Sequence, residues 1–157
     1  MPAALLAGFT ASPSQAQRSD NPLRFFDGLT ESVGTMNILS KKPVRMRSLG
    51  RGAIQPDGSL VLVQRVEEQG KAKPDRRWHI RQVAPGRFLG TMSEAKGPVT
   101  IEKVGGRYRF RFRMKGNLSA EQWLIPLPDG KSALSRLIVR KLGFPVARSE
   151  GTIRKIR

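Results

Sequence analysis

The sequence predicts an all-β fold, a single antiparallel up-and-down barrel of about 8 to 10 strands with little helix. Strong turn dipeptides recur along the chain, at Asp57-Gly58, Pro85-Gly86, Gly105-Gly106 and Asp129-Gly130. Between these turns, apolar and polar residues alternate with the period of two that is typical of half-buried strands. No window shows the apolar spacing of an amphipathic helix.

The predicted elements begin with a short turn of helix at Asn21 to Gly28, in which Phe25 and Phe26 form an apolar plug. About ten strands follow it. In order, they are Val33–Leu39, Val44–Ile54, Ser59–Glu67, Arg76–Val83, Arg87–Met92, Val99–Val104, Arg107–Lys115, Ala120–Leu127, Ser132–Arg140 and Val146–Ile156. Consecutive hairpins favour a meander, and closure into a barrel removes the exposed sheet edges that invite aggregation.

The clearest strand reads RYRFRFRMK and shows a strict alternation of aromatic and basic residues. We expect its apolar side chains to be buried, namely Tyr108, Phe110, Phe112 and Met114. Burying the cations unpaired would cost far more free energy than burial of the aromatic rings could return. The exposed set is therefore predicted to be Arg107, Arg109, Arg111, Arg113 and Lys115.

The length of 157 residues predicts one barrel domain over residues 21–157, preceded by a leader at 1–20. Met1 to Gln17 carries no charged side chain, Ala3 to Phe9 is apolar, and Ser14-Gln15-Ala16 has the small-x-small pattern of a signal-peptidase site. A basic residue near Met1, which a secretory signal normally carries, is missing. The leader is therefore either a signal peptide or a disordered segment, and the first alternative predicts export to the periplasm or cell envelope.

The composition excludes several classes of site. There is no cysteine, which rules out disulfides, zinc–cysteine sites and thiol nucleophiles, and His79 is the only histidine. Gly130-Lys131-Ser132 resembles the end of a phosphate loop, but Ile125 stands where that motif requires glycine. Glu67 and Glu68 are adjacent on a strand and so point to opposite faces. The sequence therefore offers no catalytic group, no metal site and no cofactor site.

Several stretches resemble a bacterial family catalogued as domain of unknown function number 3833. They are Phe25-Phe26-Asp27-Gly28, Gly34, Asp57-Gly58, Leu60 to Glu68, Arg76 to Ile80, Ser135 to Val139, Lys141 to Phe144 and Gly151 to Lys155. The resemblance implies a lipocalin-like, or calycin-like, barrel in the cell envelope and supplies no catalytic residue. Many members have a lipoprotein cysteine, whereas this chain has none.

The charge balance, 29 basic against 12 acidic residues and a formal net charge of +17, suggests an anionic partner. If the basic strands adjoin, their arginines would form a plate for phosphates or anionic lipid head groups. The candidate anion-binding residues are Arg107, Arg109, Arg111, Arg113, Lys115, Arg77 and Arg81, with Arg45, Arg47 and Arg51 on a further strand. The alternative is an ordinary solvated outer face.

The barrel interior is the second candidate site, because a small barrel can hold one small ligand. The pocket or core residues are predicted to be Trp78, Tyr108, Phe110, Phe112 and Trp123, with Phe88, Met114, Leu124 and Ile138 as further interior positions. We therefore expect a non-catalytic envelope protein that carries a small apolar or amphipathic ligand and docks to anionic lipid. The alternative is a basic nucleic-acid or anion-binding module in the cytoplasm. Nucleic-acid binding is disfavoured because the aromatic side chains that stack on bases and the basic side chains that bind phosphates would have to lie on the same face of a strand. In this sequence the two kinds of side chain alternate between opposite faces.

Overall fold

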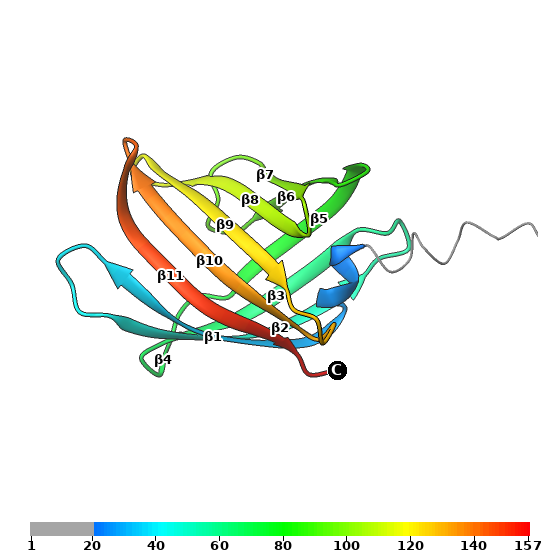
Figure 1. Cartoon of the computed structure of the whole chain (residues 1–157), viewed down its shortest axis with the longest axis horizontal. Helices are drawn as coiled ribbons and strands as arrows, with labels where there is room; N and C mark the ends of the chain where they lie inside the picture. The colour runs from blue at the N-terminus through cyan, green and yellow to red at the C-terminus, as the bar shows by residue number, and fades with distance from the viewer. Residues whose placement is uncertain (1–20) are drawn as a thin grey trace, which may run out of the picture.

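A closed β-barrel forms the computed structural model of the protein, which describes residues 21–157 (Figure 1). Ten of its eleven strands form the ring, and β4 pairs only with β3. The elements are η1 (Pro22–Phe26), β1 (Gly28–Ile38), β2 (Val44–Ile54), β3 (Leu60–Glu68), β4 (Lys71–Ala72), β5 (Arg76–Ala84), β6 (Arg87–Met92), β7 (Val99–Val104), β8 (Arg107–Met114), β9 (Leu118–Pro126), β10 (Ser132–Lys141) and β11 (Phe144–Lys155).

The topology is the predicted meander, since each long strand pairs antiparallel with the next long strand along the chain. Pairing of β1 with β11, from Thr30 opposite Lys155 to Ile38 opposite Ala147, closes the ring. The predicted bounds of β2, β6 and β7 are confirmed, and the predicted helical turn is η1, a short 3-10 helix. The expected leader at residues 1–20 lies outside the described residues.

The first strand is longer than its sequence pattern predicts, because it starts at Gly28 instead of Val33. The extra residues pair with both β2 and β11. Backbone hydrogen bonds on two sides therefore hold this segment as a strand, although its apolar and polar residues alternate only weakly. Thr30 faces the interior and is buried. Here tertiary pairing decides the local structure.

The two ends of the barrel differ. The four turn dipeptides of the sequence all lie at one end, because alternate turns of a meander return to the same end. Helix η1 covers this closed end and buries Leu23. The open end, on the left in Figure 1, carries the β1–β2, β3–β5, β6–β7, β8–β9 and β10–β11 connections.

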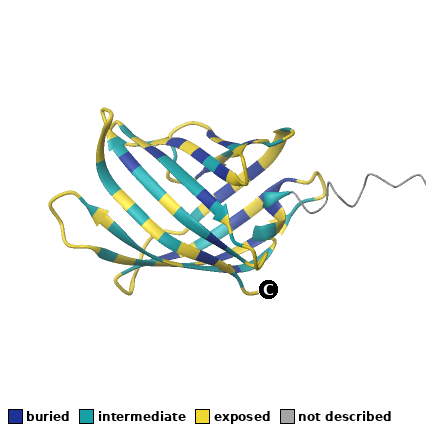
Figure 2. Cartoon of the chain, in the orientation of Figure 1, coloured by how far each residue is buried: buried dark blue, intermediate teal, exposed yellow. Residues whose placement is uncertain are grey.

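Strand β8 confirms the predicted face assignment with two exceptions, Met114 and Arg109. Met114 was predicted to be buried but is only partly buried at the end of the strand. Tyr108, Phe110 and Phe112 are buried inside, and buried and exposed residues alternate along the strands of the barrel (Figure 2). Arg109 was predicted to be exposed, but its side chain is only 24% exposed because it lies between Glu102 and the Trp123 ring.

In the part of the chain that the structure describes, no helix is long and apolar enough to cross a membrane.

Candidate ligand-binding cavity and basic outer face

The half of the barrel nearer the open end is hollow. Its cavity has a volume of about 460 Å³, within the range of small-molecule pockets. The wall is mostly apolar and methionine-rich, with Met36, Met46, Trp78, Met92 and Phe112 among its residues. The half nearer η1 is filled by a packed core that includes Leu60, Ile80, Phe88, Val99, Ile101, Tyr108, Phe110 and Leu124. The interior of the barrel therefore consists of a packed core at the closed end and a cavity at the open end.

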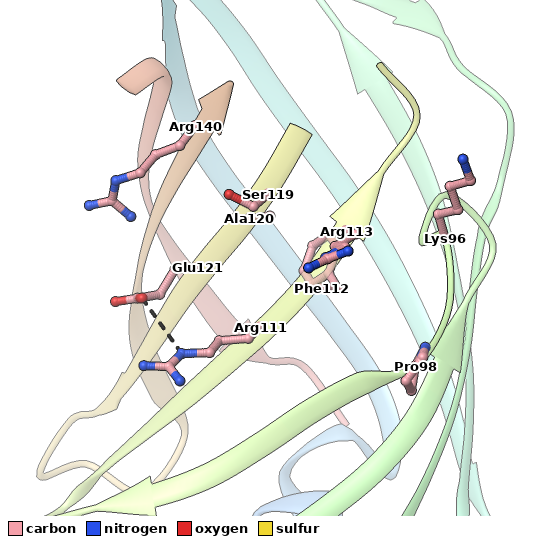
Figure 3. A pocket seen from close by; sticks show the side chains of 9 residues that line it. All are labelled: Lys96, Pro98, Arg111, Phe112, Arg113, Ser119, Ala120, Glu121 and Arg140. Atoms are coloured by element: carbon pink, nitrogen blue, oxygen red, sulfur yellow. Dashed lines mark ion pairs between the residues drawn. The ribbon is translucent and has the colours of Figure 1, made fainter. Parts of the chain in front are cut away.

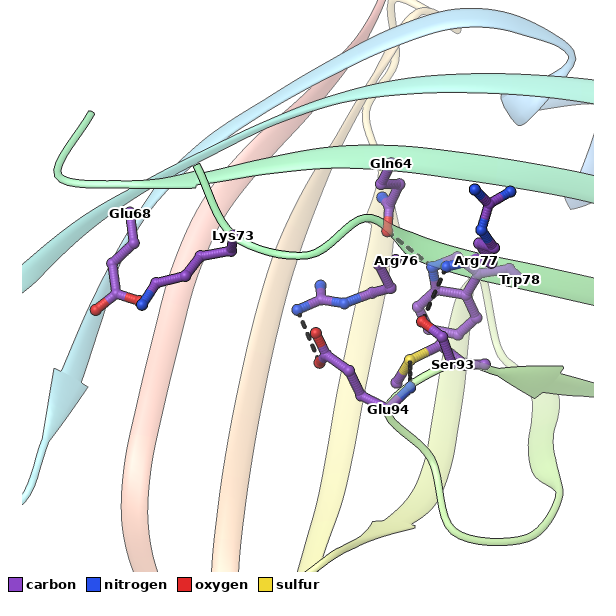
Figure 4. Close-up of polar contacts among 9 residues, drawn as sticks. Gln64, Glu68, Lys73, Arg76, Arg77, Trp78, Ser93 and Glu94 are labelled. Atoms are coloured by element: carbon purple, nitrogen blue, oxygen red, sulfur yellow. Dashed lines mark hydrogen bonds and ion pairs between the residues drawn. The ribbon is translucent and has the colours of Figure 1, made fainter. Parts of the chain in front are cut away.

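Most polar groups on the cavity wall are paired with each other. The Trp78 indole Nε1 donates to Gln64 Oε1 at 2.7 Å (Figure 4). Gln122 Nε2 donates to Ser135 Oγ at 2.8 Å, and the hydroxyls of Ser32 and Ser48 are hydrogen-bonded across the β1–β2 pair. Because these groups satisfy one another, the wall is compatible with an apolar occupant.

Arg76 is the exception among the polar groups that line the cavity. By the alternation of β5 it shares the inward face with Trp78, and its side chain is 29% exposed. Nη2 lies 3.1 Å from Glu94 Oε2, but Nε is buried and has no hydrogen-bond partner among the described residues (Figure 4). A buried donor without an acceptor is costly, so an acidic ligand group here would gain a charge-assisted hydrogen bond.

Arg76 was not among the predicted site residues, although the sequence carries a signal for it. Arg77 and Arg81 were the predicted anion-binding residues on this strand, and both lie on the outer face. Alternation alone puts Arg76 beside Trp78, on the face predicted to be internal. An arginine on the inward face of a barrel strand therefore predicts a polar contact inside the barrel.

Two predicted interior residues lie outside the barrel instead. Trp123 packs on the outer surface, where Arg107 and Arg109 lie over its ring at 5.0 and 5.5 Å and its Nε1 donates to Glu121 at 2.9 Å. The prediction was wrong because its neighbour Leu124 is buried inside, and adjacent residues on a strand face opposite ways. Ile138 is outside for the same reason, between the cavity residues Leu137 and Val139.

The remaining predicted interior residues divide between the cavity and the core. Trp78 and Phe112 line the cavity. Trp78 meets the rings of Phe110 and Phe112 edge to face, with centroids 6.2 and 6.1 Å apart. Tyr108 and Phe110 belong to the buried core. Trp78 therefore connects the cavity wall to the packed half of the barrel.

The predicted arginine plate does not form as one surface, because β6 and β7 separate Arg77 and Arg81 on β5 from the arginines of β8. Two of the β8 arginines lie beside acids on neighbouring strands. Arg109 Nη2 is 2.8 Å from Glu102 and its hydrogen bond lowers the pKa of that carboxyl, while Arg111 Nε is 3.8 Å from Glu121. The outer face is thus partly neutralised.

A shallow hollow of about 580 Å³ remains basic on this outer face (Figure 3). Arg113 and Arg140 flank Ser119 in one row across β8, β9 and β10. Lys96 and Arg111 complete the cationic lining, and Glu121 is the acid among the residues that line it. The hollow is suited to a phosphate or a similar anion.

His79 pairs with a serine, but in an order that does not suit nucleophilic catalysis. Its Nε2 lies 3.2 Å from Ser59 Oγ, and that hydroxyl donates to Asp57 Oδ1 at 2.6 Å. A catalytic triad needs the imidazole between the hydroxyl and the carboxylate. Here the serine stands in the middle, and its hydroxyl and backbone N–H both donate to Asp57, which lowers the pKa of that carboxyl. The trio stabilises the β2–β3 turn.

Comparison with known proteins supports the fold and leaves the family open. No family model matches the chain, and no curated protein matches it, so the resemblance to the family of unknown function stays a prediction. The S-type phycobiliprotein lyase CPES from Guillardia theta is similar in structure, with a TM-score of 0.69, 8% identity, and coverage of 92% of this chain and 99% of that one. The protein Rv2717c from M. tuberculosis aligns with a TM-score of 0.63, 14% identity, and coverage of 86% and 95%. The chain therefore has the predicted lipocalin-like barrel fold.

Proposed function

We propose that the protein is a non-catalytic binding protein that holds a small amphipathic ligand inside its barrel. The cavity of about 460 Å³ carries this proposal, since its wall is apolar and its own polar groups are largely paired. The barrel fold that the chain shares with a phycobiliprotein lyase and with Rv2717c supports it, because a small barrel can hold one small ligand. The apolar part of the ligand would contact the methionines and rings of the wall.

An acidic group on the ligand would lie at Arg76. The buried Nε of this side chain supports the assignment, because it has no hydrogen-bond partner among the described residues. Glu94 already binds Nη2 and would keep the guanidinium in place. The ligand class is therefore an apolar body with one carboxylate or similar anionic head.

Tryptophan fluorescence tests the proposal, because Trp78 is in the cavity wall and Trp123 is outside. In a Trp123→Phe background, a long-chain fatty acid should change the emission of Trp78 saturably. Leu137→Trp would fill the cavity and should abolish binding of an energy-transfer fatty-acid probe, whereas Arg136→Gln, on the outer face beside it, should not. Probe binding that survives Leu137→Trp would contradict the proposal.

The same probe tests the role of Arg76. Arg76→Gln should weaken binding of the fatty acid about tenfold to a hundredfold, because a hydrogen bond to a charged group is worth about 1.5–3 kcal/mol. The corresponding alcohol, which has no charge, should bind both forms equally. Arg77→Gln changes the neighbouring outward arginine and is the matched control. Equal losses for acid and alcohol would mean that Arg76 only supports the fold.

We also propose that the protein works in the cell envelope and docks to anionic lipid through its basic outer surface. The charge-free leader and the net charge of +17 support this location. N-terminal sequencing of protein from the native cell should find a mature chain that begins near Arg18. A chain in the cytoplasm that retains Met1 to Gln17 would contradict export.

A second candidate is anion binding at the outer hollow, which the cluster of Arg111, Arg113 and Arg140 favours. It corresponds to the alternative of a basic anion-binding or nucleic-acid-binding module. Titration with inorganic phosphate should shift the NMR signals of these guanidinium groups if the hollow is a site. Equal binding of unrelated single-stranded DNA oligomers would instead indicate nonspecific attraction by charge.

A further inference from the structure

The open end of the barrel exposes an apolar cluster. Leu39 in the β1–β2 connection, Leu142 in the β10–β11 connection and Phe144 at the start of β11 are 69%, 75% and 74% exposed, the highest values among the large hydrophobic residues that the structure describes. The β1–β2 connection lies beside the start of β11, because the Leu39 amide donates to the Val146 carbonyl at 2.9 Å. Packing within this chain therefore does not explain why these three positions carry large apolar side chains.

The backbone at Leu142 strengthens this observation. Leu142 has a φ of 49° and Gly143 a φ of 85°, so both residues of this tight hairpin turn adopt left-handed conformations. Asparagine or glycine is preferred at such a position, and leucine there is uncommon and strained. The other non-glycine residues with positive φ among those described are Ser40, Gln69 and Asn117, all of them polar. Leu142 therefore costs stability through strain and gains little from burial.

Lysines surround this apolar cluster. The connections and strand ends at the open end carry seven of the ten lysines of the chain, namely Lys41, Lys42, Lys71, Lys73, Lys96, Lys115 and Lys141. Lys73 pairs with Glu68 at 3.4 Å, whereas Lys41, Lys42 and Lys141 form no ion pair with the residues described. Lys41 and Lys42 follow Leu39, and Lys141 precedes Leu142. Exposed apolar tips beside free ammonium groups match the interfacial region of an anionic bilayer.

We propose that the open end of the barrel inserts Leu39, Leu142 and Phe144 into the surface of an anionic bilayer, with Lys41, Lys42 and Lys141 on the lipid phosphates. This inference rests on the proposed docking to anionic lipid and places it at the open end rather than on the β8 arginines. It also directs the mouth of the cavity, where Arg76 and Glu94 lie, toward the membrane. An amphipathic ligand could then pass between bilayer and barrel without crossing water.

The test uses vesicles of equimolar phosphatidylglycerol and phosphatidylcholine in a co-sedimentation assay. Leu142→Asn should lower the partition coefficient about tenfold, because one buried leucine contact is lost. The same substitution should raise the thermal unfolding midpoint, because asparagine tolerates the left-handed conformation better. Phe144→Ser should also lose about tenfold in binding. Val83→Asn, at a side chain 49% exposed near the closed end, is the matched control and should bind normally.

Charge variants complete the test. The triple variant Lys41→Gln, Lys42→Gln and Lys141→Gln should lower binding about a hundredfold, since each surface lysine contributes about a factor of five. The quadruple variant Arg107→Gln, Arg109→Gln, Arg111→Gln and Arg113→Gln should have a smaller effect. Full binding by Leu142→Asn and Phe144→Ser, combined with loss in the arginine variant, would overturn the inference and leave docking by the arginine face standing. Absence of vesicle binding by the unaltered protein would overturn both, and the fatty-acid experiment would still decide the cavity.

Discussion

Phe110→Ala should lower the free energy of unfolding by about 3–5 kcal/mol, a large part of the stability of a domain of this size. The ring is 8% exposed, lies opposite Ile101 on β7, and meets Trp78 edge to face at 6.2 Å. It belongs to the packed half of the barrel, so its removal leaves a void among side chains that cannot collapse fully. Urea unfolding of the two proteins measures the difference.

Two arginines on the same strand are the controls for Phe110. Arg111→Ala should change stability by within about 0.5 kcal/mol, because the side chain is 53% exposed and its nearest acid is 3.8 Å away. Arg109→Ala should cost more, because its side chain bonds Glu102 at 2.8 Å and stacks on Trp123. If arginine substitutions on β8 cost more than Phe110→Ala, the cationic side would be the interior, and an anion inside the barrel would be the leading hypothesis.

Gly34→Ala should destabilise the protein by about 1–3 kcal/mol or more, because it opens the seam that closes the barrel. Gly34 on β1 lies opposite Gly151 on β11, the first and last strands of the ring. A Cβ on Gly34 would overlap the Glu150 carbonyl oxygen, and a Cβ on Gly151 would overlap that of Val33. These contacts are with backbone, which cannot move aside as a flexible side chain could. The β1 and β11 amides should also exchange hydrogen faster.

Gly106→Ala is the matched control for this seam. A Cβ there meets nothing within 4 Å, and its φ lies outside the left-handed region. Its effect should stay within about 0.5 kcal/mol. Equal losses at Gly34 and Gly106 would mean that general chain flexibility, and not the close approach of β1 and β11, explains the glycines.

Much of the fold was predictable because period-two alternation is a local property of the chain. It identified the strands and the buried face of β8, and the turn dipeptides identified four of the connections between strands. The connections at the open end were less visible, because residues such as Leu142 and Gln69 occupy conformations that asparagine and glycine usually adopt. The start of β1 was also missed, since pairing on both sides holds residues that carry little signal themselves.

The candidate site was predicted less well, for reasons that individual residues show. Trp78 and Phe112 were correctly placed inside, whereas Trp123 could have been excluded by its neighbour Leu124. Arg76 was not predicted, because net charge does not distinguish an inward arginine from the outward arginines Arg77 and Arg81. The division of the interior into core and cavity depends on how side chains from ten strands fill one volume, and no single strand carries that information.

The sequence by itself determined that this protein is an all-β meander with a strongly basic surface and an aromatic interior, because alternation and turn chemistry act between neighbours in the chain. Only the tertiary structure decided which distant residues meet. It separated the arginines of β5 and β8 by two strands, brought Leu39 beside the start of β11, and left the Nε of Arg76 buried at an apolar cavity. Ring closure sets these relations, since the stagger and tilt of all strands together decide which side chains share an end of the barrel.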